Sequence, residues 1–189
     1  MAKITSLLTV AAVLLFVPAR GVELGPEVRA KAEKVQGALR TIETEARRMS
    51  PGQRSMTFSE AEFNAWIAFR LDEEKEPYVK SAEFKLLADD KVEGRILLVL
   101  GRSPAGGLLS ERQDLVFSAG FEAREGRIRI GLDSLFLGTQ KLSPSVIDLI
   151  IGVVSRLQGA EPTSIRDWYD LPPGVEKLRT QPGRLVVIY

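Results

Sequence analysis

The sequence predicts an α+β fold in which a curved antiparallel sheet, built as a meander of hairpins, wraps around or packs on two to three helices. Two observations favour this class. Apolar residues recur at helical spacing near the N-terminus and again after residue 143, whereas between residues 78 and 132 they alternate at a period of two. Turn-forming residues separate the alternating runs, which is typical of hairpins.

Composition bounds the class of protein. The chain has 189 residues, 44% of them hydrophobic and 27% charged, as expected for one globular domain with a real core. Lys and Arg number 26 against 25 Asp and Glu, so the net charge of +1 gathers no polyanion, and we expect no nucleic-acid partner. Cys and His are absent, which removes thiol nucleophiles, ordinary zinc sites and the commonest general base. We therefore expect neither a metal site nor a cofactor.

Residues 1–19 have the pattern of a signal peptide. Lys3 supplies the positive start, an apolar run follows to Val17, and Val17-Pro18-Ala19 is a small-residue cleavage site. The run is shorter than the ~20 residues that a spanning helix needs. We expect export to the periplasm or cell envelope, with an uncleaved N-terminal anchor, and hence membrane contact, as the alternative.

Residues 20–54 predict a long amphipathic helix that opens at Gly25-Pro26, because proline suits the first helical turn. Its apolar residues follow alternating steps of four and three: Val28, Ala32, Val35, Leu39, Ile42, Ala46 and Met49. So narrow a stripe favours packing on the chain's own sheet, with dimerisation as the alternative.

Residues 55–189 form the predicted α+β domain, whose first helix starts at a capping box of Ser59 and Glu62. Asn64 lies inside this helix, where its propensity is poor. We expect its side chain to hydrogen-bond a neighbouring loop or strand, with a catalytic role as the alternative.

Three hairpins follow in the sequence. The first turns at Asp89-Asp90-Lys91 between alternating runs, and the second turns at Glu125-Gly126. In the second hairpin, one face of the first strand is apolar, with Leu115, Phe117, Ala119, Phe121 and Ala123. The inward residues of the return strand are Ile128, Ile130 and Leu132. A last hairpin turns at Gln181-Pro182-Gly183 and closes the chain.

A helix from Ser143-Pro144 to Leu157 is apolar on nearly every side. It is either a core helix enclosed by the sheet or one wall of an apolar ligand groove. For the groove, the predicted ligand-binding residues are Ile147, Ile150, Ile151 and Val154 on the helix with Phe117 and Phe121 on the sheet.

Carboxylate catalysis needs two acids at a defined separation. The candidates Asp133, Asp148, Asp167 and Asp170 lie in separate elements without a spacing motif. Asp89-Asp90 is too small a cluster for calcium. We expect no catalytic residues.

The segment Thr57–Trp66 resembles the opening of a helix in small exported bacterial families of unknown role, including YpmS-like proteins. Their later part is similar as well, with a strand ending in Leu137-Gly138, a short loop to a Pro-headed apolar helix at Ser143-Pro144, and a closing hairpin. These families in turn resemble the tubular lipid-binding (TULIP) superfamily, whose domains wrap a sheet around a long helix and hold lipid. The resemblance covers roughly residues 55–189 and implies a lipid-binding fold, but no individual ligand residue.

Three hypotheses of function result. The first is an exported, non-enzymatic envelope protein that binds a lipid or another apolar small molecule between helix and curved sheet. The second is an envelope scaffold with a closed core that binds a protein partner through its N-terminal helix. The third is a carboxylate-dependent hydrolase using Asp148 or Asp167.

Overall fold

The computed structural model describes residues 24–46, 54–74, 79–99, 112–143, 145, 148, 164 and 166–189. Within these ranges the chain forms two helices and two antiparallel sheets, so the predicted α+β class is confirmed. The helices are α2 (Pro26–Ala46) and α3 (Glu60–Glu74). The strands are β1 (Ser55–Ser59), β2 (Val79–Leu86), β3 (Lys91–Val99), β4 (Arg112–Arg124), β5 (Arg127–Leu137), β6 (Gln140–Lys141), β7 (Trp168–Asp170), β8 (Lys177–Gln181) and β9 (Arg184–Ile188).

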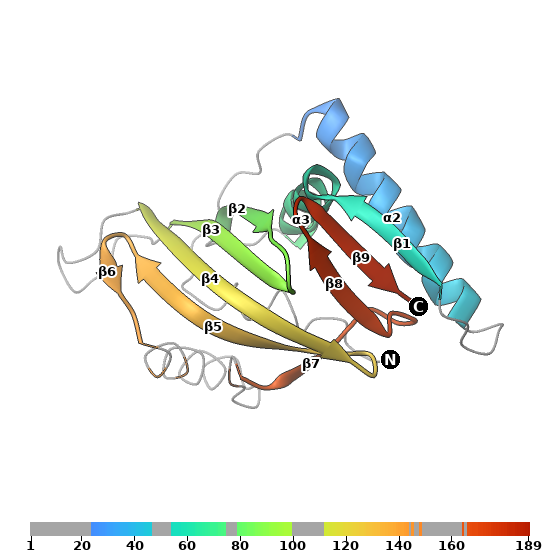
Figure 1. Cartoon of the computed structure of the whole chain (residues 1–189). Helices are drawn as coiled ribbons and strands as arrows, with labels where there is room; N and C mark the ends of the chain where they lie inside the picture. Colours follow the sequence, from blue (N-terminus) through green and yellow to red (C-terminus); the bar gives the residue numbers. More distant parts are fainter. Residues whose placement is uncertain are drawn as a thin grey trace, which may run out of the picture.

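The large sheet has the strand order β2-β3-β4-β5-β6, and β7 pairs with the start of β5 (Figure 1). Its two long hairpins turn where the sequence predicts. Asp89 and Asp90 both have positive φ angles, 59° and 58°, and so do Glu125 and Gly126, at 51° and 71°. Two successive residues with positive φ match the twist of the flanking strands. The predicted meander is therefore confirmed.

The small sheet has the order β1-β9-β8 and contains the predicted closing hairpin. Its first strand comes from the segment just before α3, so β1 pairs with a strand far away in sequence. Arg54 and Tyr189 extend this pairing by exchanging two backbone hydrogen bonds of 2.9 Å. The closing hairpin therefore belongs to a second sheet rather than to the edge of the large one.

Helix α2 begins at Pro26, as predicted, and lies beside α3 (Figure 1). Ala32, Val35 and Ile42 on its apolar stripe are all buried. Val35 and Ile42 belong to a core cluster that also includes residues of both sheets. Trp66 of α3 donates a hydrogen bond of 2.9 Å from Nε1 to Gln36 of α2. The apolar stripe therefore packs against other parts of the same chain. Residues 47–53, which include the predicted end of this helix, lie outside the described part.

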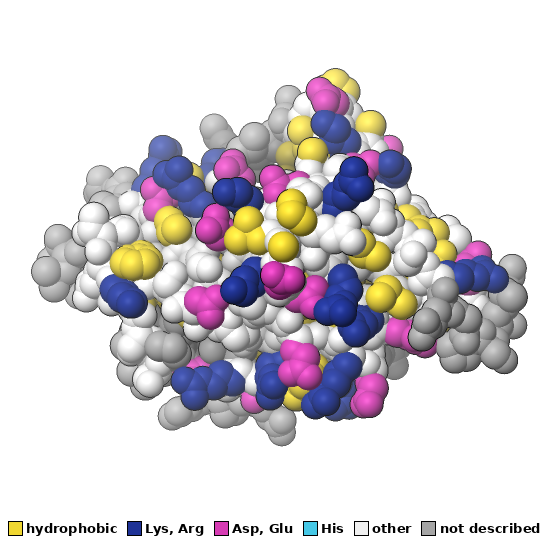
Figure 2. Space-filling view, in the orientation of Figure 1, with side chains coloured by type: hydrophobic (Ala, Val, Ile, Leu, Met, Phe, Trp, Pro, Cys, Tyr) yellow, Lys and Arg dark blue, Asp and Glu magenta, His cyan; other side chains and the backbone are white. Residues whose placement is uncertain are grey.

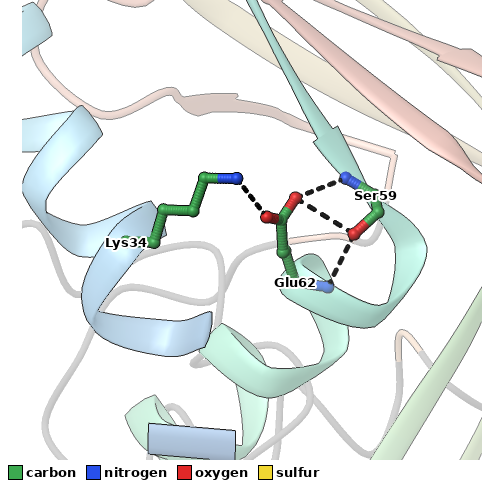
Figure 3. A network of polar contacts seen from close by, with 3 residues as sticks. All are labelled: Lys34, Ser59 and Glu62. Carbon is green, nitrogen blue, oxygen red and sulfur yellow. Dashed lines mark hydrogen bonds and ion pairs between the residues drawn. The ribbon is translucent and has the colours of Figure 1, made fainter. Parts of the chain in front are cut away.

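The predicted capping box opens α3 (Figure 3). The Glu62 carboxylate accepts hydrogen bonds from the backbone N–H of Ser59 at 2.8 Å and from its hydroxyl at 3.0 Å, and the Glu62 N–H donates back to that hydroxyl. Lys34 of α2 pairs with the same carboxylate. The ammonium of Lys34, followed by the N–H of Ser59, holds the pKa of Glu62 below its ordinary value.

Two side chains of helix α3, one turn apart, hydrogen-bond to the backbone of β2 at its outer edge. The Asn64 amide donates to the carbonyl of Phe84 and accepts from its N–H, both at 2.7 Å. The Glu60 carboxylate accepts from the N–H of Leu86 at 2.6 Å. The backbone of Gly183 bridges the same place, donating to the Leu86 carbonyl at 2.9 Å and accepting from the Glu60 N–H at 2.8 Å. The role expected for Asn64, bonding to a neighbouring strand, is confirmed.

A second polar joint links the two sheets at the turn between β2 and β3. The Asp90 carboxylate accepts from the N–H of Thr180 at 3.0 Å and pairs with Arg179. The Thr180 hydroxyl donates to the Lys91 carbonyl at 3.3 Å. Thr180 is buried, so the side chain of Asp90 supplies the acceptor that its N–H requires.

We predict that Asn64→Ala lowers the free energy of unfolding by about 1 to 3 kcal/mol, because the N–H and carbonyl of Phe84 lose their partner. Urea denaturation measures it. Asp72→Ala on the exposed side of the same helix is the control and should change stability by less than about 0.5 kcal/mol. Equal stability of the Asn64 variant and the wild type would contradict the structural role.

We predict a pH-dependent effect for Glu62→Gln. Since the folded-state pKa of Glu62 lies below its unfolded value, this carboxylate contributes stability above the unfolded pKa and loses it as the pH falls through the folded pKa. The variant should therefore be less stable by about 1 kcal/mol near neutral pH, and the difference should vanish in acid. Thermal denaturation across this pH range measures it. Glu27→Gln, at an exposed pair with Lys31, is the control and should show a smaller effect.

Candidate functional site

The structure places two of the predicted ligand-binding residues on the same face of β4. Phe117 and Phe121 are both half-buried, and both point to the side of the large sheet that carries the core. The four predicted on the apolar helix, Ile147, Ile150, Ile151 and Val154, lie outside the described residues. The candidate site is therefore built from the sheet.

Strands β4 and β5 together present a row of apolar side chains, the apolar row. Its members face each other across the two strands in four successive positions. The pairs are Leu115 with Leu137, Phe117 with Leu135, Ala119 with Leu132, and Phe121 with Ile130.

A β-bulge keeps the apolar row continuous. The register between β4 and β5 shifts between Ser118 and Ala119, so Asp133 has no direct partner between Leu132 and Ser134. Because one extra residue reverses the alternation of a strand, Leu132 and Leu135 lie on the same face although they are three residues apart. Sequence reasoning missed Leu135 and Leu137 as site residues. The sequence contains the pattern that reveals them, because the inward apolar residues of β5 fall on even positions up to Leu132 and on odd positions after it.

Burial differs between the two halves of this face. Over β2 and β3, Ala82, Leu86, Ile96 and Leu98 are at most 9% exposed, whereas Phe84 and Val92 are half-buried. Helix α3 covers this half, contributing Phe63, Trp66 and the buried Ile67. In the apolar row only Ala119 and Leu135 are buried, whereas the other six members are half-buried. Burial is thus more complete over β2 and β3 than over β4 and β5, where most members of the row are half-buried.

An aromatic series marks the boundary between the two halves. Phe63 of α3 contacts Phe84 of β2 edge-to-face, with ring centroids 5.6 Å apart, and Phe84 contacts Phe117 at 6.0 Å. The ring of Phe117 lies directly over Gly94 of β3, where a Cβ would come within 2.2 Å of it. The missing side chain of Gly94 therefore makes room for the ring of Phe117.

The two ends of the apolar row differ. Beyond Phe121 and Ile130 lie Ala123 and Ile128, each 6% exposed and part of the core cluster with Tyr169. This end is closed by protein. At the other end, the next residues on the same face are polar: half-buried Gln113 on β4, and Gln140 on β6.

The opposite face of the large sheet is charged. Arg95 and Asp114 form a bidentate pair at 3.0 and 2.8 Å, in which hydrogen bonds from Arg95 lower the pKa of Asp114. Arg129 binds Glu122 at 2.7 Å and, with Arg124, stacks on the Trp168 ring of β7. In Figure 2 basic and acidic side chains are interspersed over the sheet, with hydrophobic ones scattered between them. The same face also carries the facing pair Val116 and Phe136, with Val116 41% exposed, so its chemistry is mixed.

The carboxylates of the hydrolase hypothesis meet at Ser164. Its hydroxyl donates to Asp148 at 2.9 Å and its N–H donates to Asp167 at 2.7 Å, while its carbonyl accepts from the hydroxyl of Tyr169 at 2.6 Å. Each of these two aspartates thus accepts a hydrogen bond from one serine, as in a turn or cap. The part of the chain that the structure describes has no group of three or more His, Cys, Asp or Glu side chains able to hold a metal ion.

No protein-family model, curated protein or solved structure matches this chain. The resemblance to YpmS-like proteins and to the TULIP superfamily thus stays a hypothesis from sequence. Among the described residues, neither helix is both long and apolar enough to cross a membrane.

Proposed function

We propose that this chain is an exported, non-enzymatic protein of the cell envelope that binds a lipid or another apolar small molecule against the apolar row. In this proposal the row is one wall of the site. The observation that carries the proposal is the unequal burial of one sheet face, which is mostly buried over β2 and β3 and mostly half-buried over β4 and β5. Apolar walls of this kind are typical of small-molecule sites.

The chemistry of the surroundings supports binding rather than catalysis. The apolar row contains no titratable side chain, and Asp148 and Asp167 both bond to Ser164. The scaffold hypothesis requires a free surface on the N-terminal helix. The apolar stripe of α2 instead buries Ala32, Val35 and Ile42 inside the chain, which favours ligand binding over the scaffold.

Native mass spectrometry of protein purified from the envelope tests the proposal. A bound apolar molecule, lost after extraction with organic solvent and regained on addition of lipid, is the expected result. A protein of bare mass that also fails to bind the fluorescent apolar probe 1-N-phenylnaphthylamine would favour the closed scaffold.

We predict opposite outcomes for two tryptophan substitutions on the same face of the large sheet. Ile96→Trp replaces a side chain that is 4% exposed and should lower the free energy of unfolding by about 1 to 3 kcal/mol through overpacking. Leu132→Trp lies in the half-buried row and should leave stability nearly unchanged while abolishing binding of the probe. Urea denaturation and probe fluorescence measure the two effects. Equal destabilisation of both variants would argue that the row is a closed core.

We predict that the mature protein begins at or near Arg20, because Ala19 is a suitable last residue of a signal peptide. Sequencing the N-terminus of protein recovered from the envelope checks this. Recovery of the intact N-terminus from membranes would instead support the uncleaved anchor.

A further inference from the structure

No described strand lies beside the outer edge of β1, the last strand in the order β1-β9-β8 (Figure 1). We propose that two copies of this chain pair through this edge, antiparallel to each other, around a two-fold axis at Met56. The pairing is independent of the proposed ligand site. It follows from which backbone groups of β1 remain unbonded and from how those groups complement a second copy.

The pairing of β1 with β9 determines which backbone groups point to the free edge. Arg54 and Tyr189 exchange two hydrogen bonds of 2.9 Å, and the N–H of Glu60 donates to the Gly183 carbonyl at 2.8 Å. Bonded and non-bonded pairs alternate along an antiparallel ladder, so the odd-numbered residues of β1 direct their N–H and carbonyl groups away from β9. These residues are Ser55, Thr57 and Ser59.

Ser59 is already satisfied and ends the free edge. The Glu62 carboxylate accepts the Ser59 N–H at 2.8 Å (Figure 3), and the Ser59 carbonyl, at the N-cap of α3, faces the first helical turn. Among the described residues, nothing hydrogen-bonds to the outward groups of Ser55 or Thr57, and both residues are exposed. The free edge is therefore limited to these two residues.

An edge of this length is complementary to its own copy. In an antiparallel pair centred on Met56, Ser55 of each copy faces Thr57 of the other, and each facing pair exchanges two hydrogen bonds. Every free donor and acceptor of the edge is then used. A pair centred on Thr57 would instead place Ser55 opposite Ser59, whose N–H is held by Glu62. A longer strand of another protein would meet the same obstacle, which favours a second copy as the occupant.

The side chains of β1 allow this approach. Strand edges are ordinarily protected by charged residues, proline or a bulge, and β1, with the sequence Ser-Met-Thr-Phe-Ser, contains none of these. Its outer face presents hydroxyl groups, so no like charges would meet across the axis. On the inner face the half-buried Met56 packs against the core cluster, and the Met56 of the second copy would lie directly opposite. Because the edge is short, we expect a reversible dimer.

Disulfide cross-linking of the full chain tests the pairing, because the sequence contains no cysteine. In the proposed dimer the two Met56 residues form a non-hydrogen-bonded pair, with Cα atoms about 4.5 Å apart. Since a disulfide needs a Cα separation of roughly 4.4 to 6.8 Å, Met56→Cys should become mostly linked dimer under mild oxidation. Val116→Cys, exposed on the large sheet, is the control and should link about tenfold less.

Thr57→Cys reports on the register. In the proposed dimer the two substituted residues are not opposite each other, so this variant should link no more than the control does. Linking of Thr57→Cys but not of Met56→Cys would overturn the axis at Met56. Equal linking of all three variants, linking of none, or a disulfide between Met56→Cys and a protein of different mass would overturn the dimer.

Proline at position 57 tests the backbone hydrogen bonds. In a single copy the Thr57 N–H donates to no described residue, so Thr57→Pro should keep the wild-type circular dichroism and urea midpoint. In sedimentation velocity the wild-type coefficient should rise with concentration, whereas Thr57→Pro should weaken dimerisation by at least about tenfold. Thr57→Ser keeps the N–H and should dimerise as the wild type does.

Two results of the sedimentation series would contradict the proposal. One is a folded Thr57→Pro variant that dimerises as strongly as the wild type, and the other is a wild type that stays monomeric up to about 1 mM. If Thr57→Pro does not fold, the wild-type series and the cross-linking decide. Neither measurement involves a ligand, so failure of the dimer leaves the proposed function standing.

Discussion

The arrangement of this protein depends on how the outer edge of β2 is satisfied. An exposed strand edge presents unpaired N–H and carbonyl groups, which cost free energy when buried and invite pairing with another chain when open. Here Asn64 and Glu60, one turn apart on α3, supply side-chain partners to Phe84 and Leu86. Because both residues lie near the N-terminus of the helix, these bonds set the position of α3 on the sheet. The helix in turn packs Ile67, Phe63 and Trp66 against the apolar residues of β2 and β3.

The same helix connects the two core clusters. Phe63 and Trp66 pack against both of them, one formed with the small sheet and α2, the other with β2 and β3. The Asp90–Thr180 joint adds a polar connection between the two sheets. The apolar row borders this framework: Phe121 packs against the first cluster, and Leu115, Phe117 and Leu137 pack against the second.

Local features of the sequence predicted most of the fold, because capping, turns and alternation act over a few residues. The Ser59–Glu62 box, the paired positive-φ turns and the apolar face with Phe117 and Phe121 were all readable. The separate small sheet was not, since β1 pairs with β9 across most of the domain and no local pattern encodes that choice. The hydrogen bonds of Asn64 to a neighbouring strand were predicted, but the partner Phe84 was not, because no local pattern indicates which strand lies beside the helix. For the site, Phe117 and Phe121 were predicted and lie on the apolar row, Leu135 and Leu137 were missed because of the bulge, and the four helix residues lie outside the described part.

The bulge at Asp133 has a consequence for how such a surface evolves. Deleting this one residue would restore simple alternation and turn Leu135 and Leu137 toward the charged side, dividing the apolar surface near its middle. Moving the extra residue along β5 would lengthen or shorten the surface without any change in its composition. Insertion and deletion, rather than substitution, are therefore the economical route by which relatives of this chain would acquire sites of different size.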